Sequence, residues 1–467
     1  MLWPSLCLVS IYCYLAYHNY NVAKMASYCI QQVTKMQAQL LDHLPRATSH
    51  RLPRAAAAPP CAKPPAIDLT NDKDDAPLPQ EPIAIDDETS PADATLRNES
   101  NYCFLNATLH CLLRTRDFRA SLANAFRPLS TTRRALTPRE RCVGVLLDVT
   151  HMLKERKGAT LDLLALGLVD ALRRIGVTWI DLPRRQGQQD AEECLSYLLE
   201  LIRGVVQAPA ASLSPRSEHA LSAATKALDH VLHTCSSHDS SAYSAPLEHL
   251  ASLTWDKFIR GNPSFVADDF MGQLVQGSTC VSCNMLSYHL ATTTVVALGL
   301  HSSTAAMSLD SCLAAFKQVE DLCAEDAVYC ERCDRRTGHH IQTLFMRVPK
   351  RLVLQLKRFT CTRVGHMAKN SAAVIFPVQR LNMTPYLFSQ QAPCEYQLYA
   401  VCAHTGSSVA GGHYLAYARL SLTNGTSLWL KYNDAHLTTL SQAQMLHETA
   451  TSAYLLFYER VEPRSSI

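Results

Sequence analysis

Two Cys-x-x-Cys pairs constrain the fold of this chain more than any other feature of its sequence. Cys280 and Cys283 form the first pair, and Cys330 and Cys333 form the second after a long intervening stretch. Paired thiolates at this spacing supply two tetrahedral ligands per turn, so two such turns brought together make a closed zinc site of the structural type. Redox-active or unpaired thiols are the alternative. A nucleic-acid-binding zinc ribbon is the runner-up for the pairs taken alone and is disfavoured.

Composition indicates a large enzyme-sized protein from a reducing compartment. The chain has 467 residues and 18 Cys, and the spacing of the Cys is irregular outside the two pairs. A chain of this length does not need disulfides to fold, so metal-bound or catalytic thiols are expected. The formal charge is only +3, which excludes an electrostatic nucleic-acid clamp. With 47% hydrophobic residues, the chain can form two or three domains, or one large domain with appended tails.

Residues 1–24 are apolar but short for a membrane span. Leu2–Val22 contains no Lys, Arg, Asp or Glu, yet its strongly apolar part ends at Tyr17, short of the roughly 20 residues that cross a bilayer. Lys24 follows on the carboxyl side, an arrangement that would leave the main body in the cytosol. The segment is either a membrane anchor or an artefactual start, with translation beginning at Met25.

Residues 25–94 are predicted to form a mostly disordered linker rich in Pro, Ala and Asp. Ile67–Thr70 and Ile83–Glu88 are aliphatic stretches followed by acids, and they resemble SUMO-interacting motifs. Such motifs add a strand to an exposed sheet edge while their carboxylates meet a basic rim. A plain acidic linker with stray aliphatic residues is the alternative. Strand and helix patterns then recur from Thr95 to Arg460, apart from a Ser/Ala-rich stretch at about residues 208–245.

Cys103 lies where a polar loop is predicted to become a helix. Apolar residues recur at helical spacing after it, at Phe104, Leu105, Leu109, Leu112 and Leu113. At a helix amino terminus the dipole lowers the pKa of a thiol, and the unpaired N–H groups there can stabilise an oxyanion. A lone Cys at such a position is more often simply buried. A catalytic role therefore requires a partner base.

His413 is the candidate for that base. It follows Gly411 and Gly412, which allow close approach of the backbone to a substrate, and it precedes an alternating pattern typical of a strand. Asn424-Gly425 then predicts a two-residue hairpin turn.

The strand that returns from this turn ends in Asn433 and Asp434. Strict two-residue register places Asp434 on the face of His413, whereas one bulge exchanges it for Asn433. Either side chain could hold the imidazole tautomer, as the third member of a Cys-His-Asn/Asp arrangement does.

A further pattern begins at Gln188. Acidic residues fill the first turn of a predicted helix, and an apolar stripe follows at Ala191, Cys194, Leu195, Leu198 and Ile202. An ordinary core helix explains this pattern equally well.

In their order along the chain, these elements resemble those of the ubiquitin-specific proteases, which are papain-like deubiquitinating cysteine proteases also called ubiquitin carboxyl-terminal hydrolases. The Cys box is matched by Asn98, Asn101, Cys103, Phe104 and Asn106, and the His box by His404, Gly406, Gly412, His413, Tyr414, Asn433 and Asp434. Other matching elements are Gln188–Leu195, Phe270 with Gly272, Leu356–Phe359 and Ala453–Tyr458. The resemblance implies an α+β papain-like fold over residues 95–461, followed by a tail at 462–467. Its parts would be a helical thumb (about Thr95–Arg203), a β-rich palm and zinc-bearing β fingers (about Phe270–Gln342).

The resemblance also implies roles for single residues. Cys103 would be the nucleophile, His413 the general base and Asn433 its orienting partner, with Asp434 as an alternate or supporting acceptor. Asn98 would donate to the oxyanion. Residues implied to bind the tail of ubiquitin are Gln189, Asp190, Gly411, Gly412 and Tyr414, and the implied ligands of a structural Zn²⁺ are Cys280, Cys283, Cys330 and Cys333. Three residues depart from the family pattern: Ser100 replaces Gly, Tyr102 replaces Thr and Cys194 replaces Phe.

The expected activity is thiol-dependent hydrolysis of the isopeptide or peptide bond at the carboxyl-terminal glycine of ubiquitin. Two alternatives stay open: a protease for another ubiquitin-like modifier, or a catalytically weak ubiquitin-binding scaffold. Expected partners are ubiquitin and ubiquitinated proteins, with SUMO contacting the two linker motifs and no nucleic acid. The protein is expected to be a cytoplasmic or nuclear monomer, with membrane contact only through its amino-terminal segment.

Overall fold

The computed structural model describes most of the chain after residue 93. The described residues are 94–98, 100–115, 117–131, 134–180, 189–209, 212–234, 240–302, 304–323, 326–361, 367–389, 393–406, 411–422 and 426–461. The apolar amino-terminal segment, the linker with both SUMO-type motifs, Gln188 and the predicted tail lie outside them. Residues 85–467 form one compact unit.

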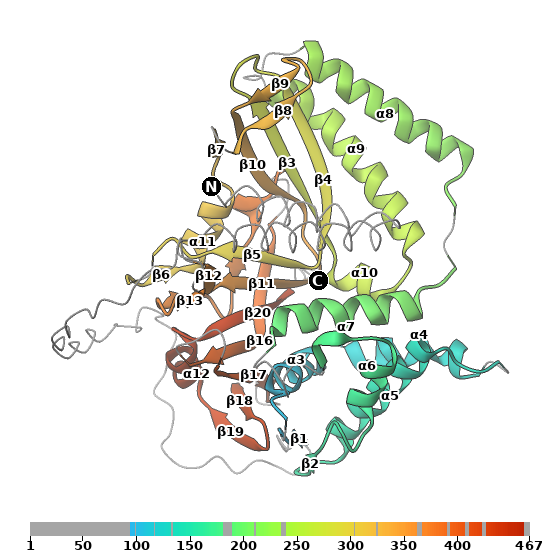
Figure 1. The fold of residues 1–467 in the computed structure, drawn as a ribbon, viewed down its shortest axis with the longest axis vertical. Helices are drawn as coiled ribbons and strands as arrows, with labels where there is room; N and C mark the ends of the chain where they lie inside the picture. The colour runs from blue at the N-terminus through green and yellow to red at the C-terminus, as the bar shows by residue number, and fades with distance from the viewer. Residues whose placement is uncertain are drawn as a thin grey trace, which may run out of the picture. The chain divides into compact units, whose positions relative to one another are not determined.

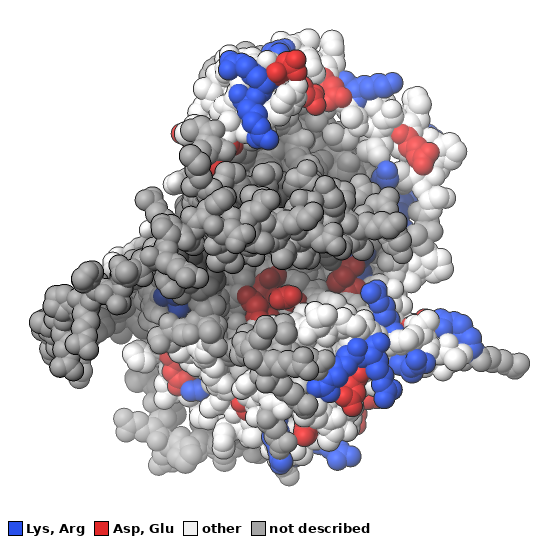
Figure 2. Space-filling view, viewed as in Figure 1, with Lys and Arg blue, Asp and Glu red and all other residues white. Residues whose placement is uncertain are grey.

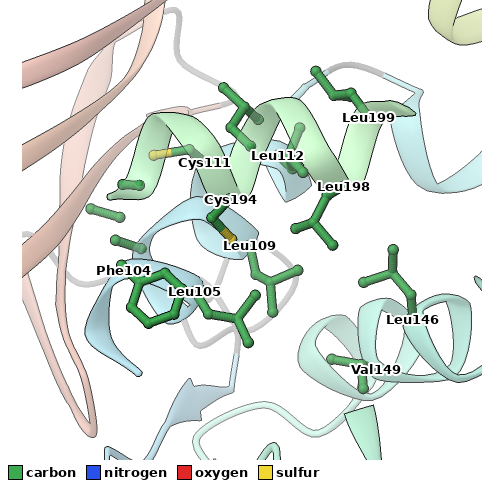
Figure 3. Packing of buried hydrophobic residues seen from close by; sticks show 14 of the residues in the cluster. Phe104, Leu105, Leu109, Cys111, Leu112, Leu146, Val149, Cys194, Leu198 and Leu199 are labelled. Atoms are coloured by element: carbon green, nitrogen blue, oxygen red, sulfur yellow. The ribbon is translucent and has the colours of Figure 1, made fainter. Parts of the chain in front are cut away.

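The part of this unit nearest the amino terminus is helical, as expected for a thumb. Its elements are β1 (Thr95–Leu96), α3 (Cys103–Leu113), α4 (Phe118–Ser130), α5 (Pro138–Glu155), β2 (Thr160–Leu161), α6 (Leu168–Arg174), the 3₁₀ helix η2 (Thr178–Ile180) and α7 (Ala191–Val206). Helix α5 begins with a capping box, in which Thr137 and Glu140 satisfy each other's backbone N–H groups. Apolar side chains of α3, α5 and α7 interlock in the core (Figure 3).

One long helix lies inside the Ser/Ala-rich stretch for which no regular pattern is expected, and a second begins at its end. They are α8 (Pro215–Thr234) and α9 (Ser240–Gly261), and the short α10 (Phe265–Phe270) follows. Only Ala224 and Leu228 of α8 are buried, so its apolar stripe is thin. Alanine favours a helix by intrinsic propensity, which explains why α8 forms although its amphipathic signal is weak.

The palm is built on a large sheet with strand order β19-β18-β17-β16-β20-β11-β5 (Figure 1). A further short strand, β15, also pairs with β16. The strands are β5 (Val295–Gly299), β11 (Arg351–Lys357), β15 (Leu381–Asn382), β16 (Glu395–Thr405), β17 (His413–Ser421), β18 (Ser427–Asn433), β19 (His436–Leu440) and β20 (Ala453–Arg460). Among the described strand pairs of this sheet, β5 with β11 is parallel and the others are antiparallel.

The two faces of this sheet line different cores. Tyr414, Ala416 and Ala418 join the thumb-side cluster, whereas Leu415 and Tyr417 join the opposite one. Helix α3 packs on β16 and β17 from the thumb side, and α12 (Gln442–Thr449) packs against β18. This contact of α3 with β17 brings the predicted nucleophile and the predicted base to the same junction.

The fingers form a second sheet, with strand order β4-β3-β10-β7. Its strands are β3 (Gly272–Cys280), β4 (Leu286–Thr293), β7 (Glu320–Leu322) and β10 (His339–Arg347), and a small hairpin of β8 (Val328–Cys330) and β9 (Arg335–Thr337) accompanies them. The predicted insertion is not continuous. Between its two halves β5, β6 (Met307–Ser308) and α11 (Leu309–Phe316) return to the palm, because Leu309, Cys312 and Leu313 are buried in the palm core.

The remaining elements of the palm are short. They are β12 (Phe359–Cys361), β13 (Met367–Lys369), β14 (Val374–Ile375) and the 3₁₀ helix η5 (Thr384–Tyr386). Among the described residues, no helix combines the length and the apolar character that crossing a membrane requires. The mixed helix and sheet architecture confirms the predicted α+β class.

Candidate active site

Cys103 is the first residue of α3, as the apolar spacing predicts. It is almost fully buried, and no side chain caps the amino-terminal turn of the helix. Backbone N–H groups at such a turn concentrate positive potential, which favours a thiolate and an oxyanion at this place. Asn98 supports the approach to the helix, since its Oδ1 accepts a 2.7 Å hydrogen bond from the backbone N–H of Tyr102.

His413 is the first residue of β17 and contacts both Cys103 and the end of β18. Its Nε2 lies 2.8 Å from Asn433 Oδ1 and 3.4 Å from Asp434 Oδ2. With Nε2 engaged there, Nδ1 is the ring atom left to face the thiol. The hydrogen bond to Cys103 raises the pKa of His413 to about 9, against the opposing effect of burial. The structure thus brings a thiol, an imidazole and an amide into one contiguous row.

The pairing of β17 with β18 explains why Asn433 is the nearer partner. Ser421 lies opposite Ser427, whereas a two-residue turn at Asn424-Gly425 would have paired Thr423 with Thr426. The strict two-residue register is therefore wrong by one residue. Because side chains alternate along a strand, this shift puts Asn433, not Asp434, on the face of His413.

Asp434 has a different set of contacts. It adopts a left-handed conformation (φ 50°) at the turn after β18. Its carboxylate accepts hydrogen bonds from Asn98 Nδ2 at 3.0 Å and from Asn106 Nδ2 at 2.9 Å. Asp434 therefore ties the hairpin of His413 to the loop before α3 and to α3 itself.

This network bears on two asparagines of the Cys box. The amide of Asn98 donates to Asp434, so its predicted role as oxyanion donor stays a prediction and would require a shared or redirected N–H. Sequence reasoning assigned no role to Asn106, which is buried and bonds both Asp434 and the Arg97 carbonyl. Its place three residues after Cys103, on a helix, is the signal that could have marked it.

Two of the predicted substrate-binding residues, Gln189 and Asp190, lie at the start of α7, whereas Gly411, Gly412 and Tyr414 lie at the start of β17. Asp190 caps this helix by accepting from the N–H of Glu192 at 2.7 Å, and it also accepts from the hydroxyl of Tyr454. Gln189 precedes it and is half-buried. Burial raises the pKa of Glu192. Glu193 is exposed at its surface, yet partial desolvation and the nearby charge of Asp190 raise its pKa as well. Acidic side chains gather near the middle of the face shown in Figure 2.

The residues around His413 are packed closely. Tyr414 is buried, and the centroid of its ring lies 5.9 Å from that of Tyr454. A Cβ on Gly412 would lie 2.4 Å from His404 Nε2, which only glycine avoids. Gly411 has open space around its Cα. The glycine at 412 is therefore required by packing, whatever contact it makes with a substrate.

Two of the departures from the family pattern are absorbed by the core. Tyr102 is buried and its hydroxyl accepts a 3.3 Å hydrogen bond from Arg173 on α6. Cys194 is buried in α7, where burial raises the pKa of its thiol. Ser100 is half-buried in the loop before α3. The bulk of Tyr102 is thus directed into the thumb.

The two Cys-x-x-Cys pairs converge at the fingers. The four Sγ atoms lie within 4.8 Å of one another, with Cys280 at 3.9 Å from Cys333 and Cys283 at 3.6 Å from Cys330. Four thiolates about 2.3 Å from a zinc ion are about 3.8 Å apart, so these spacings fit a tetrahedral site. The residue after each pair, Asn284 or Asp334, is left-handed, giving the two turns the same shape.

A family model described as ubiquitin carboxyl-terminal hydrolase matches residues 94–458. The chain is 29% identical over 387 residues to ubiquitin carboxyl-terminal hydrolase 21 of Mus musculus, covering 79% of this chain and 61% of that protein. It is 28% identical over 375 residues to ubiquitin carboxyl-terminal hydrolase 2 of Rattus norvegicus, covering 80% and 54%. The chain therefore spans about three fifths or less of the length of these curated relatives.

Solved structures share the fold. The SAGA Ubp8/Sgf11/Sus1/Sgf73 DUB module bound to ubiquitin aldehyde matches with a TM-score of 0.54 and 20% identity, covering 79% of this chain and 70% of the matched chain. A related module bound to monoubiquitin matches with a TM-score of 0.56 and 21% identity, covering 79% and 69%.

Proposed function

The chain belongs to the ubiquitin carboxyl-terminal hydrolase family, and from that premise we propose that it is a cysteine-type deubiquitinase. The observation that carries the proposal is the row formed by Cys103, His413 and Asn433 where α3 meets the start of β17. The substrate class is a protein joined through an isopeptide or peptide bond to the carboxyl-terminal glycine of ubiquitin.

The row supports acyl transfer through a thioester. The Cys103 thiolate attacks the carbonyl carbon of the terminal glycine, and the backbone N–H groups at the start of α3 face the developing oxyanion. His413 gives its proton to the leaving amine as the C–N bond breaks. It then takes a proton from water, which attacks the thioester and releases the carboxylate and the Cys103 thiol. Asn433 keeps the imidazole oriented throughout.

The acidic start of α7 supports recognition of the basic tail of ubiquitin, Leu-Arg-Leu-Arg-Gly-Gly. Glu193 is exposed there, and Asp190 lies one turn earlier at the helix cap. An arginine approaching these carboxylates would offset their mutual repulsion, which contributes to the raised pKa of Glu193.

Ubiquitin carrying an electrophilic carboxyl terminus tests the proposal directly. We expect it to label one thiol, Cys103, identified by peptide mass spectrometry, and to leave Cys323, an exposed thiol of the described chain, unmodified. The matched probe built on SUMO separates the alternative of another ubiquitin-like modifier. If neither probe labels Cys103 and ubiquitin still binds, the chain is a binding scaffold and the proposed activity is wrong.

The raised pKa of His413 predicts the alkaline limit of activity. A histidine whose pKa rises from 6.5 to about 9 stays protonated through neutral pH, so its pairing with Cys103 is fully present below about pH 6.5 and is lost as the pH rises through about 9. We expect kcat/KM for a ubiquitin–fluorophore conjugate to fall above about pH 9. Because the Cys103 bond is the largest cause, the NMR titration of the His413 ring should move toward neutral pH in Cys103→Ala. An unchanged midpoint in that variant would contradict the assignment.

We propose that the four-cysteine cluster holds one structural Zn²⁺, bound by Cys280, Cys283, Cys330 and Cys333. When bound, the ion would cross-link the two halves of the fingers and supply no chemistry to the site of Cys103. The spacing of the Sγ atoms and the matching turns support this proposal.

Further partners and location are proposed from the sequence. We propose that Ile67–Thr70 and Ile83–Glu88 bind SUMO weakly, and that two motifs on one tether favour a SUMO chain over a monomer. A peptide of residues 65–90 that shows no saturable binding to either by calorimetry would refute this.

We also propose that the protein is a monomer. Because the cysteines of the described residues are free thiols, we propose a reducing compartment, the cytoplasm or nucleus. Light scattering and imaging of the tagged protein, with and without residues 1–24, test the oligomeric state and the anchor.

A further inference from the structure

A lysine from a neighbouring hairpin holds the segment that leads into His413. Lys369 Nζ donates to the carbonyl oxygen of His404 at 2.6 Å and to that of Gly406 at 2.7 Å. We propose that Lys369 is a positioning residue, which sets the place of the His413 imidazole beside Cys103 by clamping residues 404–406. The inference rests on the proposed function for its meaning, although its first test does not need ubiquitin.

Residues 404–406 transmit their position to His413 through two contacts. Thr405 lies opposite His413 in the β16–β17 pair, and its hydroxyl donates to the His413 carbonyl at 3.1 Å. Gly406 is left-handed (φ +105°) and packs so closely on Gly412 that a Cβ would lie 2.9 Å from the Gly412 Cα. Since Gly412 directly precedes His413, a shift of Gly406 moves the base itself.

Lys369 is well placed to act as a fixed point. It lies opposite Phe359 in the β12–β13 pair, and the next residue, Asn370, exchanges two hydrogen bonds with Arg358. The Arg358 guanidinium is fully buried and also donates to the carbonyl of Ala453, at the start of β20. The backbone of Lys369 is therefore tied to the palm sheet by contacts that do not involve its own side chain.

The surroundings of Lys369 contain cations and imidazoles. In the part of the chain that the structure describes, no carboxylate forms an ion pair with it, and the groups that face it are Arg358, His404 and, beyond His404, His413. Burial, with Arg358, lowers the pKa of Lys369 to about 8. Burial and then the Lys369 charge lower the pKa of His404 to about 4, so that ring is neutral. A half-buried ammonium that donates to two carbonyls at the end of β16 is typical of a local clamp, not of a solvated surface lysine.

The test compares Lys369→Met, which keeps the apolar stem, with Lys369→Arg, which keeps a cation and N–H donors. Lys317→Met is the matched control, because Lys317 Nζ also donates to a carbonyl, that of Pro385 at 2.8 Å, in a part of the palm away from the site. The first measurement is the pH profile of iodoacetamide alkylation at Cys103, followed by peptide mass spectrometry. The second is kcat and KM for a ubiquitin–fluorophore conjugate.

We expect Lys369→Met to slow Cys103 alkylation at pH 7 and to move the pH profile of alkylation to higher pH. The reason is that the His413 imidazolium would be displaced from its position beside the Cys103 thiol. The same variant should lower kcat by about tenfold to a hundredfold, the effect of roughly 1 Å of misplacement, with KM nearly unchanged. Lys369→Arg should recover part of both losses, and Lys317→Met should match the wild type.

A folded Lys369→Met protein with wild-type alkylation and kcat would overturn the inference, even if its Tm is lower, since the lysine would then be only structural. Failure of the proposed function has a different signature. In that case the wild type does not cleave ubiquitin conjugates, while the alkylation profiles of the wild type and Lys369→Met still differ.

Discussion

Replacing Cys103 by Ala is expected to abolish hydrolysis of ubiquitin conjugates while leaving ubiquitin binding intact. The thiol supplies the attacking atom, and the rest of the row has nothing to activate once it is gone, so we expect a loss on the order of 10³-fold or more in kcat. His413→Ala should be nearly as severe, because removing one member of a catalytic unit costs about as much rate as removing the whole unit. Steady-state hydrolysis of a ubiquitin–fluorophore conjugate measures the rate, and calorimetry with free ubiquitin measures binding.

The control for the histidine is His447→Ala, at an exposed position in the last turn of α12. It should leave kcat unchanged. Turnover retained in purified Cys103→Ala would remove Cys103 from the mechanism, and a joint loss of turnover and binding would point to a damaged fold. Cys103 is itself almost fully buried, so circular dichroism of the variant belongs to the experiment.

The two reacting residues were predictable from sequence because their signals are local. A change from a polar loop to helical apolar spacing marks Cys103, and glycines before an alternating strand mark His413. The choice between Asn433 and Asp434 was not predictable, because it depends on a one-residue shift across the β17–β18 hairpin. Hairpin register is decided by the whole strand pair and not by the turn dipeptide alone.

The bonds of Asp434 could not be predicted for a different reason. Its partners Asn98 and Asn106 lie more than three hundred residues away in the chain, and only the packing of α3 on β17 brings them together. The clamp at Lys369 has the same origin, since β13 reaches the loop before His413 only through the folded palm. No periodicity in one stretch of sequence reports such contacts.

The same distinction between local sequence signals and tertiary contacts applies to the fold. The helical thumb and the palm strands follow from strong apolar patterns, whereas α8 was missed because its apolar stripe is so narrow. The fingers were predicted from the family resemblance as a single insertion that carries the two cysteine pairs. The return of β5 and α11 to the palm depends on tertiary burial, which the spacing of the pairs does not contain.

Replacing Cys283 by Ser is expected to destabilise the protein more than it changes the chemistry at Cys103. A metal held by the four thiols would add a link between the end of β3 and the β8–β9 hairpin. Without it, the two segments meet through the pairing of Cys280 with His339 and the hydrogen bond from the Val281 N–H to the Gly338 carbonyl. A closed structural zinc site contributes folding free energy directly, so losing one ligand should cost several kcal/mol. For a unit of this size we expect the Tm to fall by roughly 5–10 °C.

Elemental analysis of the purified wild type should find one zinc per chain, and Cys283→Ser should contain less. Cys323→Ser is the matched control, because Cys323 is an exposed thiol close to the fingers strand β7 and outside the cluster. Its metal content and Tm should equal those of the wild type. Since the cluster supplies no group to the row at Cys103, the folded fraction of Cys283→Ser should keep a kcat close to normal below its lowered Tm. A metal-free wild-type preparation with an unchanged Tm would refute the zinc site, and the four thiols would then be a reduced cluster without a structural role.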